Sequence, residues 1–487
     1  MSETPVLIGI AQIEQRCDDP LAAREPLALM IEAARAAAED AGNPALLGAV
    51  GSVRVVRGIW PYKNPARVIA EAIGVPGAET ALTQFGGNFV QTAVNQAAAD
   101  IQAGRQEIIL VTGAECGNTQ AKARRAGLDL RSKLNWQPAP GQPEVMIGAD
   151  VPMVDEIEAA VGLMQPIQIY PMFENALRHH LGESIDAHQK KISELWARFS
   201  AVAAANPHAW IREPRSAEEI RTISDFNRPV SFPYPKLMNS NNNVDQAAAL
   251  ILCSAARARA LGIPEDKWVY PWAGTDAHDA YVFSQRDNFY ESPAIRVAGG
   301  RVLEACDLAP ADVDLVDVYS CFPVAVQVGA REIGLDLDRP LTVTGGLTFA
   351  GGPLNNYVMH SIARMAELLR EDRNARGLIT ANGGYLTKHA FGVYSATPPE
   401  KPFQHQDVQA EVDRFPLRRA VASHEGPATV ESYTVMYGGD APRIAYVSAL
   451  LDDGQRTLAS TEDADVMAAM TREEFCGRSV KLSDNRA

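Results

Sequence analysis

Apolar runs suited to buried strands alternate with helical segments along most of this 487-residue chain. Val6–Ile13 (VLIGIAQI) and Glu107–Glu115 (EIILVTGAE) are nearly continuous apolar runs, which are typical of strands buried on both faces. Leu27–Gly42 lies between them and has an alanine-rich helical periodicity that stops at a glycine. This alternation predicts an α/β fold with a mixed or parallel sheet.

The alternation is interrupted once and then resumes. Residues 119–243 are more polar, contain a long helical stretch and end in the asparagine cluster Asn239–Asn243, so we expect an inserted, mostly helical segment there. From residue 244 to 400 the strand and helix signals return in an order that echoes residues 1–118, although no residue-level repeat is visible. The predicted domains are therefore 1–118, 119–243 and 244–400.

The last part of the chain has a different pattern. Residues just after 400 are typical of a linker, and residues 412–487 contain short β-rich runs separated by the turn signals GGDA and DDGQ. We expect a final domain of several antiparallel strands, folded as a small OB-like β-barrel.

Composition limits the function classes. The net charge of −15 argues against a nucleic-acid partner, but a locally basic pocket for a phosphorylated ligand is compatible with it. The N-terminal residues lack the features of a signal peptide, and no stretch approaches the roughly 20 apolar residues of a membrane span. The six cysteines are scattered without a CxxC pair, which suits a reducing compartment and disfavours structural zinc. We expect a soluble cytoplasmic protein without a metal.

The stretch TQFGGNFVQTAV is a glycine turn that leads into a helix. Gly86 and Gly87 precede Asn88, a residue type favoured at helix N-caps. The free N–H groups and the positive end of the helix dipole would favour an anion or an oxyanion there. The alternative is a strand-to-helix turn that is capped for stability, and the local sequence favours this alternative.

A second candidate lies where the run VDLVDVYSCF ends. Pro323 starts a helix there, and Tyr319 and Cys321 alternate with Ser320, so they should face the opposite side from it. Cys321 would be a nucleophile if a base lay beside it, although a lone cysteine at a buried strand end is more often a packing residue. Tyr319 would serve as an acid or base if its pKa were lowered.

Two further glycine-rich stretches carry candidate residues. The first, TGGLTFAGGPLNN, includes Gly352 and has turns that allow a ligand to approach the backbone closely, as ordinary loops also do. The second, TANGGYLTKHAFGVYS, contains Asn382, Gly383, Tyr385, Lys388 and His389. A Lys–His pair beside glycine turns would bind an acidic group or transfer protons, and the alternative is a solvated lysine next to a core histidine.

The order of several short motifs resembles the thiolase superfamily. GIAQI, VTGAE, ANPHAW, VDQAAALIL and GGPLNN follow one another as in sterol-carrier-protein-2-type thiolases and in thiolase-like relatives with an additional C-terminal domain. The resemblance covers essentially the whole chain. It implies a thiolase fold of two similar halves in five layers (αβαβα), with a helical loop insertion in the first half. It also implies acyl-coenzyme A as the ligand class, with coenzyme A as substrate or ligand.

The catalytic residues of the superfamily do not transfer to this sequence. The nucleophilic cysteine falls on Phe85, Gly86 or Gly87, and the NEAF-type loop matches residues 319–322, so its asparagine or histidine is Tyr319. The histidine of the GHP-type loop is Gly352. The second cysteine falls on Ala381, which Asn382 and Gly383 follow. The resemblance therefore excludes the usual covalent acyl-cysteine mechanism.

Three functions remain open. The favoured one is non-covalent carbon–carbon cleavage or formation of the retro-aldol type on a CoA thioester, with Tyr319 and either Tyr385 or His389 transferring protons. It is favoured because the sequence resembles thiolase-fold retro-aldolases, which lack the cysteines and recruit a DUF35-type partner. We expect a comparable module to be fused to this chain. The alternatives are a non-catalytic acyl-CoA binding protein and an acetyl-CoA acyltransferase that uses Cys321.

In each case Lys388 and Asn243 are predicted to contact the substrate. The expected partner is a small acyl-CoA molecule, and the expected state is a homodimer or a monomer.

Overall fold

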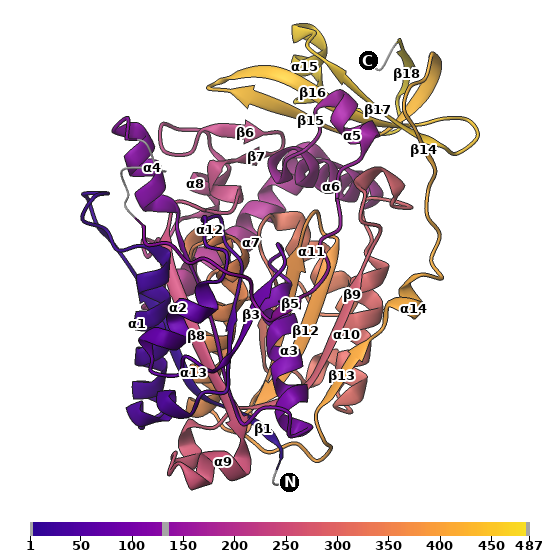
Figure 1. The fold of residues 1–487 in the computed structure, drawn as a ribbon. Coiled ribbons are helices and arrows are strands. Elements are labelled where there is room, and N and C mark those ends of the chain that lie inside the picture. Colours follow the sequence, from indigo (N-terminus) through magenta and orange to yellow (C-terminus); the bar gives the residue numbers. More distant parts are fainter. Residues whose placement is uncertain (1–2, 129–135, 484–487) are drawn as a thin grey trace.

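Two mixed β-sheets and their covering helices form the body of the molecule in the computed structural model, which describes residues 3–128 and 136–483 (Figure 1). The first half contains the strands β1 (Pro5–Glu14), β2 (Ser52–Val55), β3 (Glu79–Thr83), β4 (Ile108–Cys116), β5 (Val145–Ile147) and β8 (Asp245–Ser254). Its helices are α1 (Pro26–Asp40), α2 (Pro65–Ala72), α3 (Phe89–Gln102), α4 (Gly117–Arg125) and α9 (Ala255–Ala260).

The second half contains the strands β9 (Tyr270–His278), β10 (Leu315–Asp317), β11 (Arg376–Gly383), β12 (Lys388–Ser395) and β13 (Gln404–Asp407). Its helices are α10 (Pro293–Ala305), α11 (Pro323–Ile333), α12 (Gly346–Phe349), α13 (Tyr357–Glu371) and α14 (Gln409–Val412).

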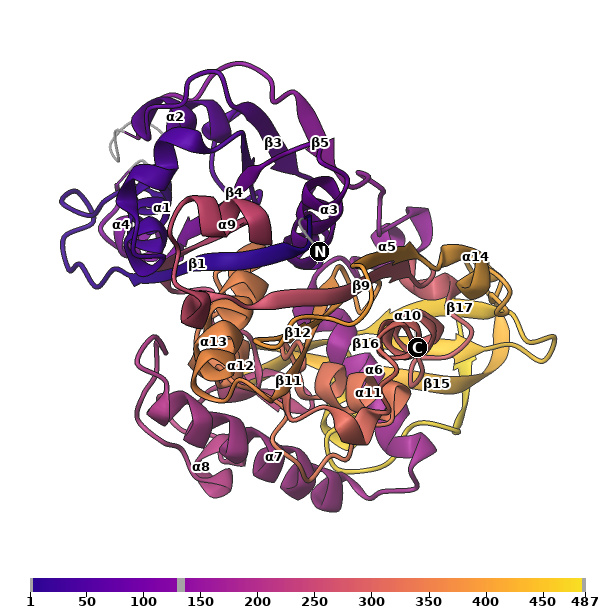
Figure 2. The same cartoon turned by 90° about the horizontal axis from the view of Figure 1, so that it is seen from below.

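The two halves stack as five layers. Helices α3 and α13 lie between the sheets and contact strands of both, while α1 covers the outer face of the first sheet and α10 that of the second (Figures 1 and 2). Close packing of α1 on β1 depends on Gly9, because a Cβ there would lie 2.2 Å from the carbonyl oxygen of Ala37. The α/β fold in five layers that the sequence predicts is thus confirmed.

The echo between the two halves is a repeat of topology. The first sheet has the order β1-β8-β4-β2-β3-β5 and the second β10-β11-β12-β9-β13. Read from β1 and from β9, the same pairs occur in the same sense: two antiparallel pairs (β1–β8 and β8–β4, β9–β12 and β12–β11), then one parallel pair (β4–β2, β11–β10). The two halves therefore have the same sheet topology, although no residue-level repeat is visible between their sequences.

The inserted segment is mostly helical and lies at one end of the sheets (Figure 1). Its elements are α5 (Glu156–Val161), α6 (Pro166–His180), α7 (Ile185–Ala205), α8 (Ala217–Arg221), β6 (Pro229–Ser231) and β7 (Tyr234–Pro235). Part of the predicted inserted range, residues 129–135, lies outside the described residues. The segment after residue 400, expected to be a plain linker, instead supplies β13, which pairs in parallel with the edge of β9, and α14.

The C-terminal part is rich in strands, as predicted. It contains β14 (Ala420–Val421), β15 (Gly426–Gly438), β16 (Ala441–Leu450), β17 (Arg456–Thr461), β18 (Ser479–Leu482) and α15 (Ala464–Met470). The turns GGDA and DDGQ join β15 to β16 and β16 to β17. The sheet continues from β15 into β6 and β7 of the inserted segment, and the pairs described up to residue 483 run openly from β14 to β7 without one that closes a barrel.

Within residues 3–128 and 136–483, no helix combines the length and the apolar character that crossing a membrane would require.

A buried ionic network fixes α6 and α7 to the body of the protein. His188 on α7 lies between two carboxylates, with Nε2 2.6 Å from Glu174 and Nδ1 2.5 Å from Glu183. Glu174 also accepts hydrogen bonds from Tyr234 and from Gln327 of α11. Burial alone would lower the pKa of His188, but the two carboxylates outweigh it and raise the pKa, which favours the imidazolium.

We predict that His188→Gln lowers the melting temperature by about 3 °C or more at pH 6, because it leaves the buried carboxylate of Glu174 without its cation. Since the folded-state pKa of His188 is raised, its stabilisation is present below the unfolded value of about 6.5 and is lost as the pH rises through the folded value. The difference in melting temperature between wild type and His188→Gln should therefore narrow at high pH. Lys190→Gln, an exposed change on the same helix, serves as the control, and equal melting curves for wild type and His188→Gln at pH 6 would contradict the prediction.

Candidate active site

The glycine turn before α3 lies against the ends of two strands of the other half. A Cβ added at Gly87 would lie 2.6 Å from the backbone oxygen of Asn382 and 2.7 Å from the hydroxyl oxygen of Tyr319. These two atoms therefore occupy the space that a side chain at position 87 would need. No nucleophilic side chain fits at this turn position without displacing them.

The neighbouring glycine has a similar surrounding. A Cβ at Gly86 would lie 2.6 Å from Oδ1 of Asn88 and 2.9 Å from Nζ of Lys388, and one at Gly383 would lie 2.3 Å from the same Asn88 oxygen. The Asn88 side chain thus lies between Gly86 and Gly383 and makes no capping hydrogen bond to α3. Its Oδ1 is buried and has no hydrogen-bond partner in the described part of the chain.

A cavity of about 410 Å³ opens at this turn. It gathers seven of the predicted residues, which are Gly86, Gly87, Tyr319, Cys321, Asn382, Gly383 and Tyr385. Five predicted residues do not line it: Asn88, Asn243, Gly352, Lys388 and His389. The strand ends, the glycine turn and the hairpin of β11 and β12 therefore meet where the resemblance places a catalytic centre.

Tyr319 presents a free hydroxyl to this cavity. Its ring packs edge-on against Tyr357, with ring centroids 5.5 Å apart, and within the described residues its hydroxyl has no hydrogen-bond partner. Burial raises the pKa of Tyr319 well above the ordinary value, and Cys321 adds to the effect. Tyr319 is therefore a phenol that donates a hydrogen bond at neutral pH, and the lowered pKa that general-base catalysis would need is not present.

Asp317 holds the strand end that carries Tyr319. Its buried carboxylate accepts hydrogen bonds from the Val343 N–H (2.9 Å), the Ser361 hydroxyl (2.8 Å) and the Tyr357 hydroxyl (2.9 Å). The Tyr319 N–H in turn donates to Thr380 Oγ1 of β11 at 2.9 Å. This network fixes the direction of the Tyr319 side chain.

Cys321 lies in a network without a base. Its sulfur accepts a hydrogen bond from the Asn382 side-chain amide at 3.8 Å, and the same amide donates to the Tyr170 hydroxyl at 2.9 Å. Burial raises the pKa of Cys321 to about 12. The thiol keeps its proton at neutral pH, which is unsuitable for a nucleophile.

Tyr385 and His389 use their polar atoms elsewhere. The Tyr385 hydroxyl donates to the backbone oxygen of Met164 at 2.6 Å, and burial raises its pKa. His389 faces the buried Asp279, with Nε2 3.6 Å from the carboxylate and 3.2 Å from the Leu386 oxygen. Burial acts to raise the pKa of Asp279, but Arg286, at 3.3 Å, and His389 hold it below its usual range.

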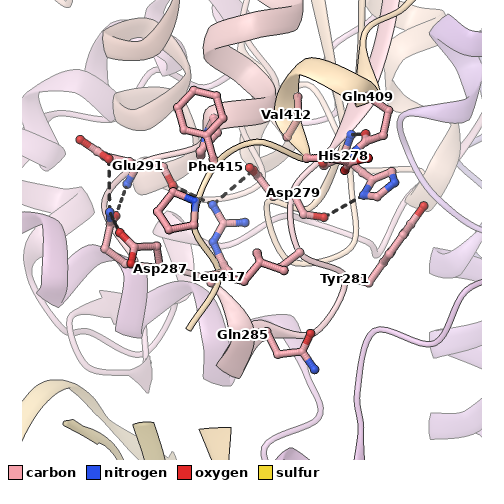
Figure 3. Close-up of a pocket in the computed structure, with 16 residues that line it drawn as sticks. His278, Asp279, Tyr281, Gln285, Asp287, Glu291, Gln409, Val412, Phe415 and Leu417 are labelled. Atoms are coloured by element: carbon pink, nitrogen blue, oxygen red, sulfur yellow. Dashed lines mark hydrogen bonds and ion pairs between the residues drawn. The ribbon is translucent and has the colours of Figure 1, made fainter. Parts of the chain in front are cut away.

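Asp279 and Arg286 also line a separate cavity of about 450 Å³ beneath the segment that follows α14 (Figure 3). Figure 3 shows Phe415 and Leu417 of that segment beside Asp279, with Asp287 and Glu291 on the side away from His278 and Tyr281. Arg286 donates to the Leu386 oxygen at 2.8 Å, so this cavity adjoins the far side of the β11–β12 hairpin. It contains none of the predicted catalytic residues.

Sequence reasoning missed several lining residues. Tyr170 comes from α6 and Asn239, Ser240 and Asn242 from the asparagine cluster, whereas the predicted Asn243 does not line the cavity. Gly352 contacts this cluster, because a Cβ there would lie 3.1 Å from the Asn242 side-chain oxygen. The asparagine cluster was visible in the sequence, but the sequence did not show which of its residues line the cavity.

One group of side chains in the described residues has the spacing of metal ligands, namely His179, Glu474 and Cys476. Glu474 is already paired with the buried Arg178, whose nitrogens lie 2.5 Å and 3.0 Å from its oxygens. The guanidinium would repel a cation at this position. The group lies apart from the cavity at the glycine turn.

The two-half fold and the turn before α3 are those of a thiolase-like protein. Residues 407–486 match the family described as the thiolase-like protein type 1 additional C-terminal domain. The structure is similar to that of a monomeric SCP2-thiolase-like protein type 1 from Mycobacterium smegmatis, with 31% sequence identity and a TM-score of 0.85, covering 100% of this chain and 99% of that one. The chain belongs to this type 1 family of SCP2-thiolase-like proteins.

More distant relatives share parts of the chain. An acetyl-CoA acetyltransferase from Methanocaldococcus jannaschii is 21% identical over 67% of this chain and 80% of its own length. The Ltp2–ChsH2(DUF35) aldolase has the same fold over 81% of this chain and 98% of its own, with 18% identity and a TM-score of 0.61. The predicted oligomeric states were a homodimer and a monomer, and the monomeric relative supports the monomer.

We predict that Gly87→Ala lowers the melting temperature by at least a few degrees, because overpacking against Asn382 and Tyr319 costs about 1–3 kcal/mol. Gly77→Ala is the matched control, since nothing lies within 4 Å of a Cβ there. Thermal melts of the two variants measure the difference. A Gly87→Ala protein as stable as Gly77→Ala would show that the space beside Gly87 is open.

Proposed function

We propose that the protein binds the acyl-pantetheine part of an acyl-CoA thioester in the cavity at the start of α3, without forming a covalent acyl-enzyme. The observation that carries this proposal is the position of the Tyr319 hydroxyl, 2.7 Å from where a side chain at Gly87 would begin. A hydrogen-bond donor thus stands where an acyl-transfer enzyme of this fold would present its nucleophile. The site is suited to holding a carbonyl oxygen.

The backbone supplies further donors. The N–H groups of Gly87 and Asn88 make no hydrogen bond within the described residues, and they lie at the positive end of the 14-residue helix α3. Together with the Tyr319 hydroxyl they form a donor set of the kind that binds a thioester oxygen or its enolate. Because burial raises the pKa values of Tyr319, Cys321 and Tyr385, all three side chains stay protonated and neutral beside it.

The cavity's size and lining limit which part of the ligand it holds. About 410 Å³ is in the range of small-molecule sites, and apolar side chains such as Met153, Ile167 and Leu347 line it. No lysine or arginine is among its lining residues, all of which are described. The acyl group and the pantetheine arm fit such a surrounding, and the phosphates would lie outside it.

We predict that wild-type protein binds acyl-CoA in isothermal titration calorimetry and that Tyr319→Phe weakens the affinity about fivefold, the loss of one hydrogen bond of about 1 kcal/mol. Cys321→Ser should bind as wild type does. Tyr290→Phe, which removes a hydroxyl from a ring stacked on His180 outside the cavity, is the matched control. If octanoyl-CoA and acetyl-CoA both fail to bind the wild type at millimolar concentration, the proposal is wrong.

A second candidate function is retro-aldol cleavage of a β-hydroxyacyl thioester. It is favoured by the Tyr319 hydroxyl, which lies beside the same donor set and, as a protonated phenol, would donate a hydrogen bond to the enolate that leaves. Incubation with β-hydroxyacyl-CoA should then release an acyl-CoA shortened by the cleaved fragment, together with an aldehyde or ketone. The release should need no free CoA and should be lost in Tyr319→Phe. Binding without release leaves the binding function alone.

A further inference from the structure

A third cavity lies on the other side of the glycine turn, and the buried side chain of Lys388 lines it. It measures about 320 Å³ and is bordered by the first turn of α3, the ends of β9 and β12, and β13. We call it the lysine cavity, after Lys388. Its lining includes Thr92, Gln96, Asp276, His278, Lys388 and His405.

Lys388 is buried in this cavity and has no ion-paired carboxylate within the described residues. Only 6% of the residue is exposed, and within the described chain its Nζ has one hydrogen-bond acceptor, the Phe85 backbone oxygen at 2.7 Å. The centroid of the Phe89 ring lies 5.0 Å from Nζ. Two of its three N–H donors are therefore available to a ligand.

Burial lowers the pKa of Lys388 to about 8, although Asp150 opposes the shift. Compared with the ordinary value of about 10.4, this gives a few hundred times more neutral amine at pH 7. A desolvated lysine that has no ion-paired carboxylate is the kind of amine that attacks carbonyl carbon.

The amine also occupies a distinctive place in the fold. Nζ lies 2.9 Å from the position that a Cβ at Gly86 would take, so it stands where a side chain of the turn itself would begin. The turn thus has a phenol on one side, at Gly87, and an amine on the other, at Gly86. We propose that Lys388 is a nucleophilic amine that forms an imine with a small polar aldehyde or ketone entering the lysine cavity.

The step balances without an oxidant or reductant. The Nζ lone pair attacks the carbonyl carbon, the C–N bond forms, and the carbonyl π bond opens to a hydroxyl. The C–O bond then breaks and water leaves, carrying the carbonyl oxygen and two hydrogens from the amine. His405, whose Nε2 lies 2.6 Å from the Asp276 carboxylate, lines the same cavity.

The polar surroundings define the ligand class. The side chain of Gln96 offers hydrogen bonds to a hydroxylated carbonyl compound, and Asp276 and Asp407 disfavour a strongly anionic one. The other titratable groups that line this cavity are Asp276, His278 and Tyr281 in and after β9, His389 of β12, and His405 and Asp407 of β13, and Asp150, after β5, also acts on the charge of Lys388.

The test uses glycolaldehyde with sodium cyanoborohydride, which traps an imine as a stable amine on the full-length protein. After brief treatment at pH 7, peptide mass spectrometry should place the label on Lys388 more than about tenfold faster than on the exposed Lys481. Lys388→Arg should lose this fast label and Lys481→Arg should keep it. The labelling rate of Lys388 should rise with a midpoint near pH 8.

The labelling rates of Lys388 and Lys481 in the wild-type protein are enough to test the proposal, so the test does not depend on whether Lys388→Arg folds. Labelling of Lys388 that is no faster than that of Lys481 overturns the proposal, as does a rate midpoint above pH 10. The inference is independent of thioester binding, because the probe contains no coenzyme A. Loss of acyl-CoA binding in Tyr319→Phe leaves it unchanged.

Discussion

The close approach between the start of α3 and the strand ends of the other half is the contact on which the site depends. Gly87 lies so near the Asn382 carbonyl and the Tyr319 hydroxyl that no side chain fits between them. That approach exists because α3 lies between the two sheets and contacts β9 and β12 of the second half as well as β1 and β8 of the first. A helix of one half thereby presents its amino end to loops of the other.

The same geometry explains why much of the fold could be predicted and part of the site could not. Strands β1 and β4 are buried on both faces, and α1 is rich in alanine, so periodicity revealed them and their order carried the family resemblance. The cavity is different, because residues far apart in the sequence build it. Tyr170 stands in a helix whose sequence has no mark of a site, and the choice between Asn242 and Asn243 depends on the loop's path.

The roles of individual residues were harder still, because burial decides them. The sequence suggested that Cys321 would act only with a base beside it and Tyr319 only with a lowered pKa. Burial instead raises the pKa values of both residues. The neighbours of the Cys321 sulfur are amide and hydroxyl groups and include no base. His389 was grouped with Lys388 because the two are adjacent, but neighbours on a strand point to opposite faces. His389 accordingly faces Asp279, and Lys388 faces the Phe85 carbonyl.

The inserted segment and the C-terminal strands act as one structure over the end of the sheets. Ser231 of β6 pairs with Met436 of β15, and Asn175 of α6 donates to the Tyr433 backbone oxygen at 2.9 Å. Helix α6 in turn supplies Tyr170, whose ring stacks on Phe322 with centroids 4.5 Å apart, next to Cys321. The C-terminal strands therefore support, through α6, the wall of a cavity that they do not themselves line. Changes in that sheet should reach the cavity by moving Tyr170, since the aromatic stack and the amide hydrogen bond to Asn382 both depend on its position.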